Sequence, residues 1–352
     1  MDTDRSDLRQ IKIYSGLLAL LGGVVVLKQL SFLFIPFSLA LLFFFLCNGL
    51  VARLTSAGFP RRLVLTGVML LLLAGLFLIG LLLYSGASTL VERFPHYSQR
   101  LVEMGKLVVA RLHLPEATVR PESLAARFDP QQITRLITTT LGTFSSFLGD
   151  AVLVLLFLMF MLGGSESLKT RLRRSLAPDH ASSFLRIYTA IDGRIQRYVV
   201  IKTAMSLATA LLAGAILALG GFDFVLLSAL LVFFFNFIPT FGSVVGTVFP
   251  VLIGFLQYGL CWRVGIVLLG LMAMQFTMGN VVEPKITGRR LNLSPVVILA
   301  SLLFWGWLWG MVGMVLSVPL TSVVKIGLEQ IPSLRPVAAV LGGGGGFSER
   351  TP

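Results

Sequence analysis

The stretch Val281-Val282-Glu283-Pro284-Lys285-Ile286-Thr287-Gly288-Arg289-Arg290-Leu291-Asn292-Leu293-Ser294-Pro295 is a short polar segment between two apolar runs. These runs extend from about 264 to 278 and from 296 to 318. Pro284 cannot continue the hydrogen-bond ladder of a helix, and Gly288 permits a tight turn. We therefore predict two membrane helices that are joined by a tightly turned cationic loop.

The remaining residues of this loop fit the same interpretation. Ser294 and Pro295 suit the N-cap and the first turn of the following helix. Asn292 is typical of a turn. The loop carries three positive charges, on Lys285, Arg289 and Arg290. We expect these residues to determine membrane topology rather than to bind substrate.

Two runs of the chain resemble a known family. The first run begins at Glu283 and reads EPKITGRRLNLSPVVILASLLFWGWLWGMVGMVLSVPL; it resembles the signature of the autoinducer-2 exporter-like permeases. The second run begins at Phe235 and reads FNFIPTFGSVVGTVFP; it resembles the second signature of the same family. The resemblance covers roughly residues 10 to 335. It implies a bacterial permease with about eight spans that exports a small polar solute such as autoinducer-2. It also implies a homo-oligomer, with a pentamer as the candidate assembly.

The composition agrees with a membrane protein. Of 352 residues, 56% are hydrophobic and 13% are charged, whereas about 25% of the residues in a soluble domain are charged. The apolar residues form blocks of membrane-spanning length, which predicts an all-α, polytopic transmembrane protein in the lipid bilayer. The net charge of +13 fits positive-inside topology and anionic lipid better than nucleic acid. Neither a disulfide nor a metal site is expected from Cys47, Cys261 and the scattered histidines.

The chain divides into six segments. In the segment 87–146, Pro95 is one of several expected helix breakers. The segment 199–335 contains two helical hairpins, 222–257 and 296–327. The segments are 1–86 with transmembrane helices 1–3, 87–146 as an amphipathic extracytoplasmic or interfacial region, 147–163 with transmembrane helix 4, 164–198 with basic cytoplasmic amphipathic helices, 199–335 as the transport core, and 336–352 as a disordered Gly-rich tail.

Both hairpins contain Pro or Gly at a hinge, at 236–242 and at 306–310. Seventeen helical residues rise only about 25 Å, against a hydrocarbon thickness of about 30 Å. One or both hairpins are therefore candidates for re-entrant segments that return to the side from which they entered. The sequence leaves open whether each hairpin spans or re-enters.

The distribution of lysine and arginine predicts the orientation. With a cytoplasmic N-terminus, the cytoplasmic segments hold 19 of these residues, whereas the short outer turns hold only Lys28 and Arg263. The segment 87–146 holds 7, but its length weakens its influence. We predict a multi-pass protein of the bacterial inner membrane with both termini in the cytoplasm.

The hinges are the first candidates for a substrate or ion path. An interrupted helix exposes backbone groups, which is tolerated at membrane depth only where they line a cavity or are covered by protein. At the first hinge, Asn236 and Thr240 are candidate lining groups beside Pro239 and Gly242; the alternative is that these residues only permit close packing. The second hairpin contributes Trp305, Gly306, Gly310 and Pro319, and its tryptophans are expected mainly as lipid anchors.

Glu283 is the carboxylate of greatest interest. It either binds a proton, another coupling ion or a substrate hydroxyl, or forms a structural ion pair with Arg289, Arg290 or Lys285. The sequence leaves both interpretations open. Gln275 and Asn280 lie near a helical turn from Glu283 and are candidates for the same face.

The absence of two catalytic motifs argues against an ATP-driven motor and a hydrolase, and three candidate functions remain. Neither a phosphate-binding G-x-x-x-x-G-K-[ST] loop nor a G-x-S-x-G nucleophile elbow occurs, so we expect no ATP-driven motor, no enzyme and no cofactor. The main prediction is a secondary permease that exports a small polar solute, with proton or sodium as the coupling ion if there is one. The alternatives are a sodium/proton antiporter, which the scarcity of ionisable residues in the first five spans makes weaker, and a non-transporting membrane scaffold.

Overall fold

The computed structural model describes residues 2–111, 149–164, 178–239, 241–259, 261–287, 293–331 and 334–342. All regular elements within these ranges are helices, which confirms the all-α class. Six of the described helices are long and apolar enough to cross a membrane. Three shorter apolar helices accompany them, at Tyr14–Gln29, Gly149–Gly164 and Val225–Phe235. The protein is therefore a multi-pass membrane protein.

The first three helices form one side of the molecule. Helix α1 (Asp2–Gln29) is followed at once by α2 (Ser31–Ser56), so the predicted tight turn near residue 29 is confirmed. Helix α3 (Arg61–Arg111) was expected to end near residue 85 and to be broken at Pro95, and this expectation was wrong, because the helix continues through Pro95. A proline removes only one hydrogen bond from the helical ladder, and the long flanking helix tolerates that loss.

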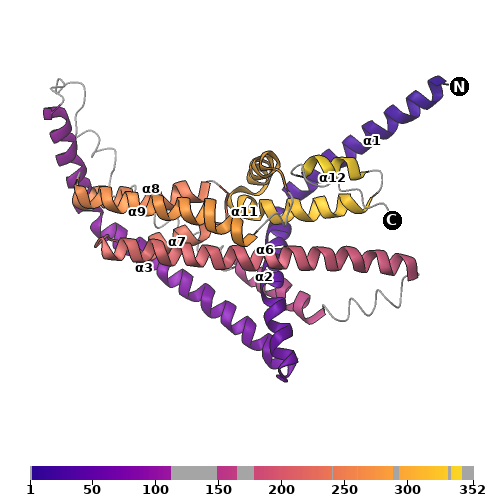
Figure 1. Cartoon of the computed structure of the whole chain (residues 1–352), viewed down its shortest axis with the longest axis horizontal. Coiled ribbons are helices and arrows are strands. Elements are labelled where there is room, and N and C mark those ends of the chain that lie inside the picture. Colours follow the sequence, from indigo (N-terminus) through magenta and orange to yellow (C-terminus); the bar gives the residue numbers. More distant parts are fainter. Residues whose placement is uncertain are drawn as a thin grey trace.

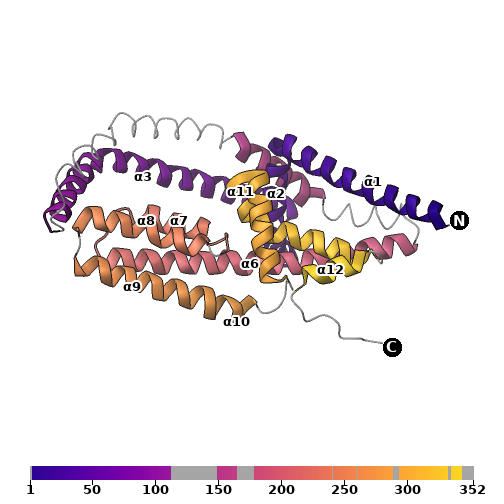
Figure 2. The same ribbon diagram turned by 90° about the horizontal axis from the view of Figure 1, so that it is seen from above.

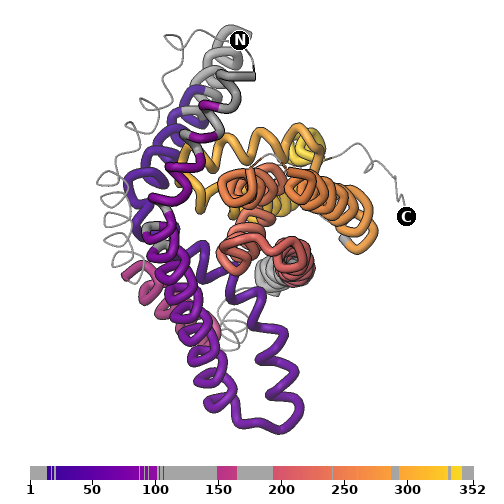
Figure 3. The backbone as a smooth tube through the Cα atoms, turned by 90° about the vertical axis from the view of Figure 1, so that its left-hand side faces the viewer, coloured from indigo at the N-terminus to yellow at the C-terminus, as the bar shows by residue number. Residues whose placement is uncertain are grey.

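The other side of the molecule is a bundle of α6 (Pro178–Leu219), α7 (Val225–Phe235), α8 (Phe241–Tyr258) and α9 (Trp262–Thr277). The helices α6, α8 and α9 run side by side, and the shorter α7 lies between α6 and α8 (Figures 1 and 2). Figure 3 looks along these helices and shows α3 passing obliquely outside them. An apolar core holds the bundle together and includes Ala213, Leu217, Val232 and Leu271.

One helix passes through the boundary expected at residue 198. The second part of the predicted amphipathic segment 164–198 and the fifth span form one unbroken helix, α6, which begins at Pro178. Gly193–Leu219 is the part of α6 with the length and apolarity of a membrane span. A continuous helix of this length connects the membrane core rigidly to the region beyond it.

The polar loop after α9 also differs from the expectation. A π-helical turn (Met278–Val282) follows α9, and α10 (Glu283–Thr287) continues from it, so Pro284 lies inside a helix rather than at its end. The Glu283 N–H donates to the Met278 carbonyl, which is the five-residue spacing of a π-turn. The wider turn lies directly before Pro284, and it relieves the clash that the proline ring would make in a regular helix.

The C-terminal part begins with α11 (Pro295–Gln330), which bends sharply at Trp309 and Gly310. The predicted second hinge is thereby confirmed. Gly310 has φ 62°, in the region that favours glycine, and the two arms of α11 run in different directions (Figure 2). Helix α12 (Arg335–Leu341) packs on α11 and corrects the expectation of disorder from residue 336 onwards; residues 343–352 lie outside the described part.

The ends of the helices agree with the predicted sidedness. The beginning of α1, the beginning of α6 and helix α12 lie at one end of the molecule, and the far end of α3 lies at the other (Figures 1 and 2). We call the first the α1/α12 end and the second the α3 end. The arrangement fits both chain termini on the same side of the membrane, which stays a prediction.

Candidate functional site

A polar face runs along the membrane-spanning part of α6. It consists of Lys202, Ser206 and Thr209, which are spaced by four and three residues and therefore lie on one side of the helix. All three are buried, and Ser206 is the central residue of the span Gly193–Leu219. Burying polar groups at this depth is costly unless they have partners, so their partners identify the site.

The partner of Lys202 is Glu283. The Lys202 Nζ atom lies 2.6 Å from Oε1 of Glu283, and the lysine side chain is 7% exposed whereas the glutamate side chain is 26% exposed. The pair joins α6 to α10 across 81 residues of sequence. Glu283 is thus ion-paired within the described structure, and the candidate partners Arg289 and Arg290 lie outside the described residues.

The π-turn determines that Glu283 reaches α6. The buried positions of α9 are Val264, Val267, Leu271 and Gln275. In a regular helix, this spacing would continue to residues 278 and 282 and would place residue 283 beside that face. A π-turn inserts roughly one residue into the helix, so it rotates Glu283 onto the face that packs against α6.

The partner of Ser206 is the first hinge. The Asn236 Nδ2 atom donates to Oγ of Ser206 at 2.9 Å, so the interruption between α7 and α8 contacts the middle of α6. Backbone bonds from Phe241 N–H to the Pro239 carbonyl and from Gly242 N–H to the Ile238 carbonyl tighten the hinge. The structure therefore has the predicted helical interruption, and Asn236 and Pro239 lie at it.

Gly242 is required for this hinge. A Cβ atom at this position would lie 2.0 Å from the Phe235 carbonyl oxygen, which no side chain tolerates. The hinge thus brings the end of α7 against the start of α8 with no space for a side chain. Thr240, the other candidate lining group, lies outside the described residues.

The two polar residues of span six lie apart from each other. Gln275 is buried and packs toward Gly246 of α8, where an added Cβ would lie 3.1 Å from the Gln275 Nε2 atom. Asn280 is exposed, and its Nδ2 atom donates to the Phe276 carbonyl of its own helix. Gln275 therefore belongs to the interior of the bundle, whereas Asn280 does not join the face of Glu283.

Helix α7 carries one further buried hydroxyl. Ser228 is fully buried, and its Oγ has no hydrogen-bond partner within the described parts of the chain. It lies one turn before Val232, a residue of the bundle core, and therefore on the core-facing side of α7. An unpaired buried hydroxyl is unusual in a folded protein and is available to a passing polar group.

The second hinge holds its tryptophans inside the protein. The Nε1 atom of Trp305 donates to Oγ1 of Thr321 at 3.1 Å, and that of Trp309 donates to the Leu27 carbonyl at 3.0 Å. Lipid anchoring was the expected role, and it is wrong for these two buried residues. Trp307 is exposed and lies against Lys28, as a residue at the membrane surface would.

The other residues of the second hairpin serve its packing. Gly306 lies against Met314, and Gly313 lies against the Trp305 backbone, where a Cβ would be 1.9 Å from the carbonyl oxygen. Pro319 is buried inside the second arm of α11. These contacts make the kink a packed joint between the two arms of α11.

At the α3 end, a polar cluster connects α3 to the turn between α6 and α7. We call this cluster, which consists of Arg93, Tyr97 and Asp223, the clamp. Asp223 accepts a hydrogen bond from the Tyr97 hydroxyl at 2.7 Å and pairs with Arg93 at 2.5 Å. The Asp223 carboxylate therefore joins α3 to the turn between α6 and α7. Burial and the hydrogen bond to Asp223 raise the pKa of Tyr97 to about 12, so the phenol stays neutral and donates at physiological pH.

The same turn is fastened to α8. The Asp223 N–H donates to Oε1 of Gln257, and the Tyr258 hydroxyl donates to the Gly221 carbonyl at 2.5 Å. Both ends of the α7–α8 hairpin therefore meet at this turn. Since the eleven residues of α7 rise only about 17 Å, α7 is too short to cross the membrane by itself.

A second group of charges lies at the α1/α12 end of α6. Glu329 of α11 is 3.6 Å from Arg194 of α6 and 3.6 Å from Lys325, which is buried one turn earlier on α11. Helix α6 therefore participates in charged contacts both near its beginning and within its span.

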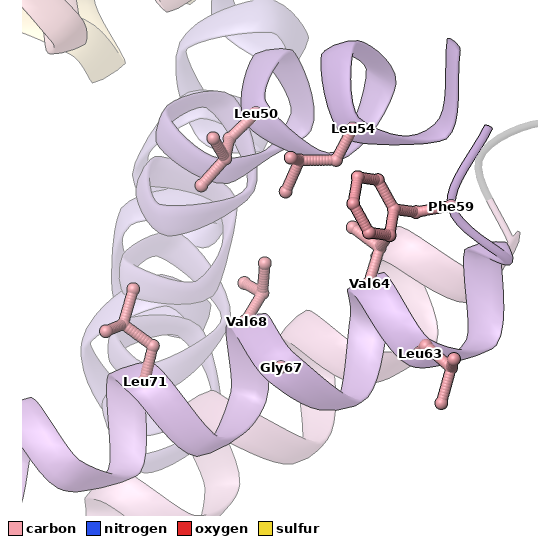
Figure 4. A pocket seen from close by; sticks show the side chains of 8 residues that line it. All are labelled: Leu50, Leu54, Phe59, Leu63, Val64, Gly67, Val68 and Leu71. Carbon is pink, nitrogen blue, oxygen red and sulfur yellow. The ribbon is translucent and has the colours of Figure 1, made fainter. Parts of the chain in front are cut away.

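A groove elsewhere in the described structure has a different character. It has a volume of about 350 Å³ and lies between α2 and α3 near their connection (Figure 4). Its lining residues are apolar, among them Leu54, Phe59 and Leu71. A groove without polar groups suits hydrocarbon and cannot orient a polar solute, so the polar face of α6 remains the candidate site.

The predicted loop is only partly described. Gly288, Arg289, Arg290 and Asn292 lie outside the described residues, and Lys285 is exposed. The predicted helix start is confirmed, because the Ser294 Oγ accepts a hydrogen bond from the Val297 N–H at 3.2 Å and Pro295 is the first residue of α11.

Sequence reasoning missed Lys202. A signal existed in the sequence. The topology prediction counted the lysines and arginines of the cytoplasmic segments, the short outer turns and the segment 87–146. Of the 29 lysines and arginines, Lys202 alone lies outside these segments. A lysine inside an otherwise apolar span indicates a buried partner or a function. Its partner could not be identified from the sequence, because the π-turn that rotates Glu283 was not predicted.

Comparison with known proteins identifies the family. The model of the AI-2E family transporter matches residues 15–333. The chain belongs to the AI-2E transporter family. It is 33% identical over 321 residues to the AI-2 transport protein TqsA of Escherichia coli (strain K12), which covers 90% of this chain and 92% of TqsA.

Two further relatives of the family span nearly the whole chain. A Haemophilus influenzae protein, whose name gives transport as a provisional assignment, is 32% identical over 346 residues, with 94% of this chain and 97% of the relative covered. YhhT of Escherichia coli (strain K12), also provisionally a transport protein, is 29% identical over 348 residues, with 98% of both chains covered. The family resemblance expected from the two signature runs is therefore confirmed, and the protein is a membrane permease.

Proposed function

We propose that the protein is a secondary permease of the bacterial inner membrane that exports a small polar solute. The observation that carries this proposal is the hydrogen bond between Asn236 and Ser206. It brings the interruption between α7 and α8 to the central residue of a membrane-length helix. Interrupted helices at this depth are a common basis of solute sites in secondary transporters.

Further polar groups support a path through the bundle. Lys202 and Glu283 lie on the side of Ser206 toward the start of α6, and Thr209 lies on the opposite side of Ser206 along the same face. The free hydroxyl of Ser228 lies on α7, toward the turn at Asp223. These groups offer hydrogen bonds to a polar solute along the length of the bundle.

Autoinducer-2 is the first candidate solute, because the name of TqsA assigns its transport to that relative. We propose export from the cytoplasm, with both termini cytoplasmic and the α1/α12 end inside. A homo-oligomer fits the α7–α8 hairpin, because the hairpin contains a helix too short to span and needs protein cover on its remaining sides.

The test is solute flux in liposomes. Purified protein is reconstituted, the vesicles are loaded with autoinducer-2, and efflux is compared with that from protein-free vesicles. Asn236→Ala should reduce the flux at least tenfold, because it removes the contact between the hinge and α6. The matched control is Asn280→Ala, an asparagine of similar membrane depth that contacts only its own helix and whose loss should leave flux unchanged. Equal fluxes in the two variants would contradict the proposal.

A sodium/proton antiporter is the second candidate function. The observation in its favour is the Lys202–Glu283 pair, because it supplies an ionisable site inside a span, where the sequence analysis had found almost none. An antiporter would move sodium in response to a pH gradient without any organic solute. Measurement of intravesicular pH after a sodium pulse separates the two functions.

A further inference from the structure

The Lys202–Glu283 pair separates the polar face from one aqueous side. Lys202 lies one helical turn before Ser206 on α6, so a solute that moves from the α1/α12 end toward the Asn236–Ser206 contact meets the pair first. The pair also bridges α6 and α10, which pack against each other. Passage along the polar face therefore requires the two charges to separate.

Separation is costly for the lysine in particular. Its side chain is 7% exposed, whereas that of Glu283 is 26% exposed and lies near the end of the candidate span Trp262–Ile286. An unpaired ammonium group at this depth is unfavourable, and protein interiors avoid it by supplying a replacement partner. Glu283 can instead become neutral by taking a proton from water.

Among the described residues near the pair, no second carboxylate is available to Lys202. The elements that pack against α10 are α6 and the π-turn. On α6, the titratable groups near Glu283 are Lys202 and Tyr198, and neither is a carboxylate. On α10 itself, Lys285 is exposed and positively charged. The described carboxylates Asp223 and Glu329 are engaged in contacts with other partners.

We propose that Lys202 binds an anionic group of the transported solute, and that Glu283 takes up one proton when the anion displaces it. This inference deepens the proposed function by giving the charge class of the solute and its coupling ion. The charge balance of the site favours an anion. The closed site holds one positive charge, on Lys202, and one negative charge, on Glu283. The occupied site holds the positive charge of Lys202 and the negative charge of the solute, beside a neutral Glu283. A cationic solute would leave the opened site with a net positive charge.

The coupling follows from the same balance. One proton and one monoanion enter together and leave together, so the translocation is electroneutral and moves both in the same direction. During export, the gradient of the solute drives its own flux and carries a proton outward. The membrane potential has no effect on an electroneutral step.

The experiment uses the full chain in liposomes that contain a pH-sensitive dye. The probe is pyruvate, a carboxylate whose neutral acid is scarce at neutral pH, and the comparison solutes are a neutral sugar and sodium ion. Wild type should acidify the lumen in response to an inward pyruvate gradient at least fivefold faster than protein-free vesicles. A potential clamped with potassium and valinomycin should not change that rate.

The variants separate binding from coupling. Lys202→Met should lose the pyruvate-dependent pH change, Lys202→Arg should keep a substantial part of it, and Lys285→Met, which alters an exposed lysine nearby, should retain it. Glu283→Gln mimics the protonated carboxyl group, so its pyruvate flux, followed with labelled pyruvate, should persist without a proton and become sensitive to the clamped potential. Thermal unfolding in detergent checks folding, and pyruvate should stabilise wild type and not Lys202→Met.

Each alternative result overturns the inference in a recognisable way. Flux of autoinducer-2 or of the neutral sugar without pyruvate flux or pH change would refute the anion site and leave the permease function intact. A pH change driven by sodium alone would favour the antiporter. Absence of both pyruvate flux and pyruvate stabilisation would refute the inference, and the asparagine variants would still test the permease function independently.

Discussion

At the scale of single residues, the ion pair between Lys202 and Glu283 is asymmetric. The lysine side chain is nearly enclosed by protein, whereas about a quarter of the glutamate side chain is not covered by the described protein, with 26% exposed. Removing one member of a buried pair leaves the other charge uncompensated, and the cost depends on how deeply the remaining charge is buried. The two single substitutions should therefore have different effects on stability.

We expect Glu283→Gln to destabilise the protein more than Lys202→Met does. The first leaves a buried ammonium group, at a cost of roughly 2–4 kcal/mol, whereas the second leaves a carboxylate that can hydrate and costs about 1 kcal/mol. The double variant should be more stable than Glu283→Gln alone. Thermal unfolding in mild detergent measures the differences; equal effects of the two single substitutions would show that the pair is not differently buried at its two ends.

Tyr97 gives a pH-dependent prediction. Its pKa in the folded protein is about 12, above the ordinary value of about 10, because burial and the bond to Asp223 favour the neutral phenol. The stabilisation is therefore complete below about pH 10 and is lost as the pH rises through 12. Between these values, wild type should lose thermal stability more steeply than Tyr97→Phe, which cannot ionise. Parallel pH profiles for the two proteins would contradict the assignment of the clamp.

At the scale of elements, the α7–α8 hairpin depends on the hinge. Its far ends are fastened at the turn around Asp223, and its hinge contacts α6 through Asn236. The hinge needs the absent side chain of Gly242, because the Phe235 carbonyl occupies that space. A substitution there must displace α7 from α8, or the hinge from α6.

Gly242→Leu should therefore reduce solute flux at least tenfold and lower the unfolding temperature. The matched control is Gly265→Leu in α9, where an added Cβ would meet no atom within 4 Å. Both variants add the same side chain to an apolar membrane segment, so insertion should be comparable. Full flux in Gly242→Leu would show that the close approach at the hinge is dispensable.

At the scale of the whole molecule, we expect the α1/α12 end and the α3 end to face opposite sides of the membrane. The connection between α8 and α9 lies at the α3 end (Figure 1). Cys261 belongs to this connection and is partly exposed, whereas Cys47 is buried. Thr287 is the last residue of α10 and belongs to the loop for which the charge distribution predicts a cytoplasmic location. Native and introduced cysteines can therefore report both sides.

We expect a membrane-impermeant thiol reagent to label Cys261 in intact cells. In a Cys261→Ser background, Thr287→Cys should be labelled only after the cells are permeabilised. Labelling of Thr287→Cys in intact cells, together with protection of Cys261, would reverse the orientation.

The assembly gives a further prediction at this scale. We expect mass measurement in mild detergent to find a homo-oligomer, with the pentamer as the candidate species, because α7 is too short to cross the membrane and needs protein cover. A monomer that retains full solute flux after reconstitution at one chain per vesicle would contradict this expectation.

The sequence by itself determined the parts of this protein that depend on neighbouring residues. Apolar runs of sufficient length predict membrane helices, Pro239 and Gly310 mark the two interruptions, and Ser294 caps α11, because each depends on local hydrogen bonding and transfer to the bilayer. Pro95 and Pro284 misled the prediction for the same reason, since a local rule ignores the stability of a long helix and the presence of a π-turn.

Only the tertiary structure decided which polar groups meet. Lys202 and Glu283 are 81 residues apart, and their contact depends on a π-turn that rotates Glu283 and on the packing of α10 against α6. The burial of Trp305 was likewise invisible in the sequence, because the same residue anchors in lipid or fills a protein interior according to its neighbours. Contacts between helices depend on their relative rotation and depth, and a change of one residue in helical phase turns a side chain by about 100°.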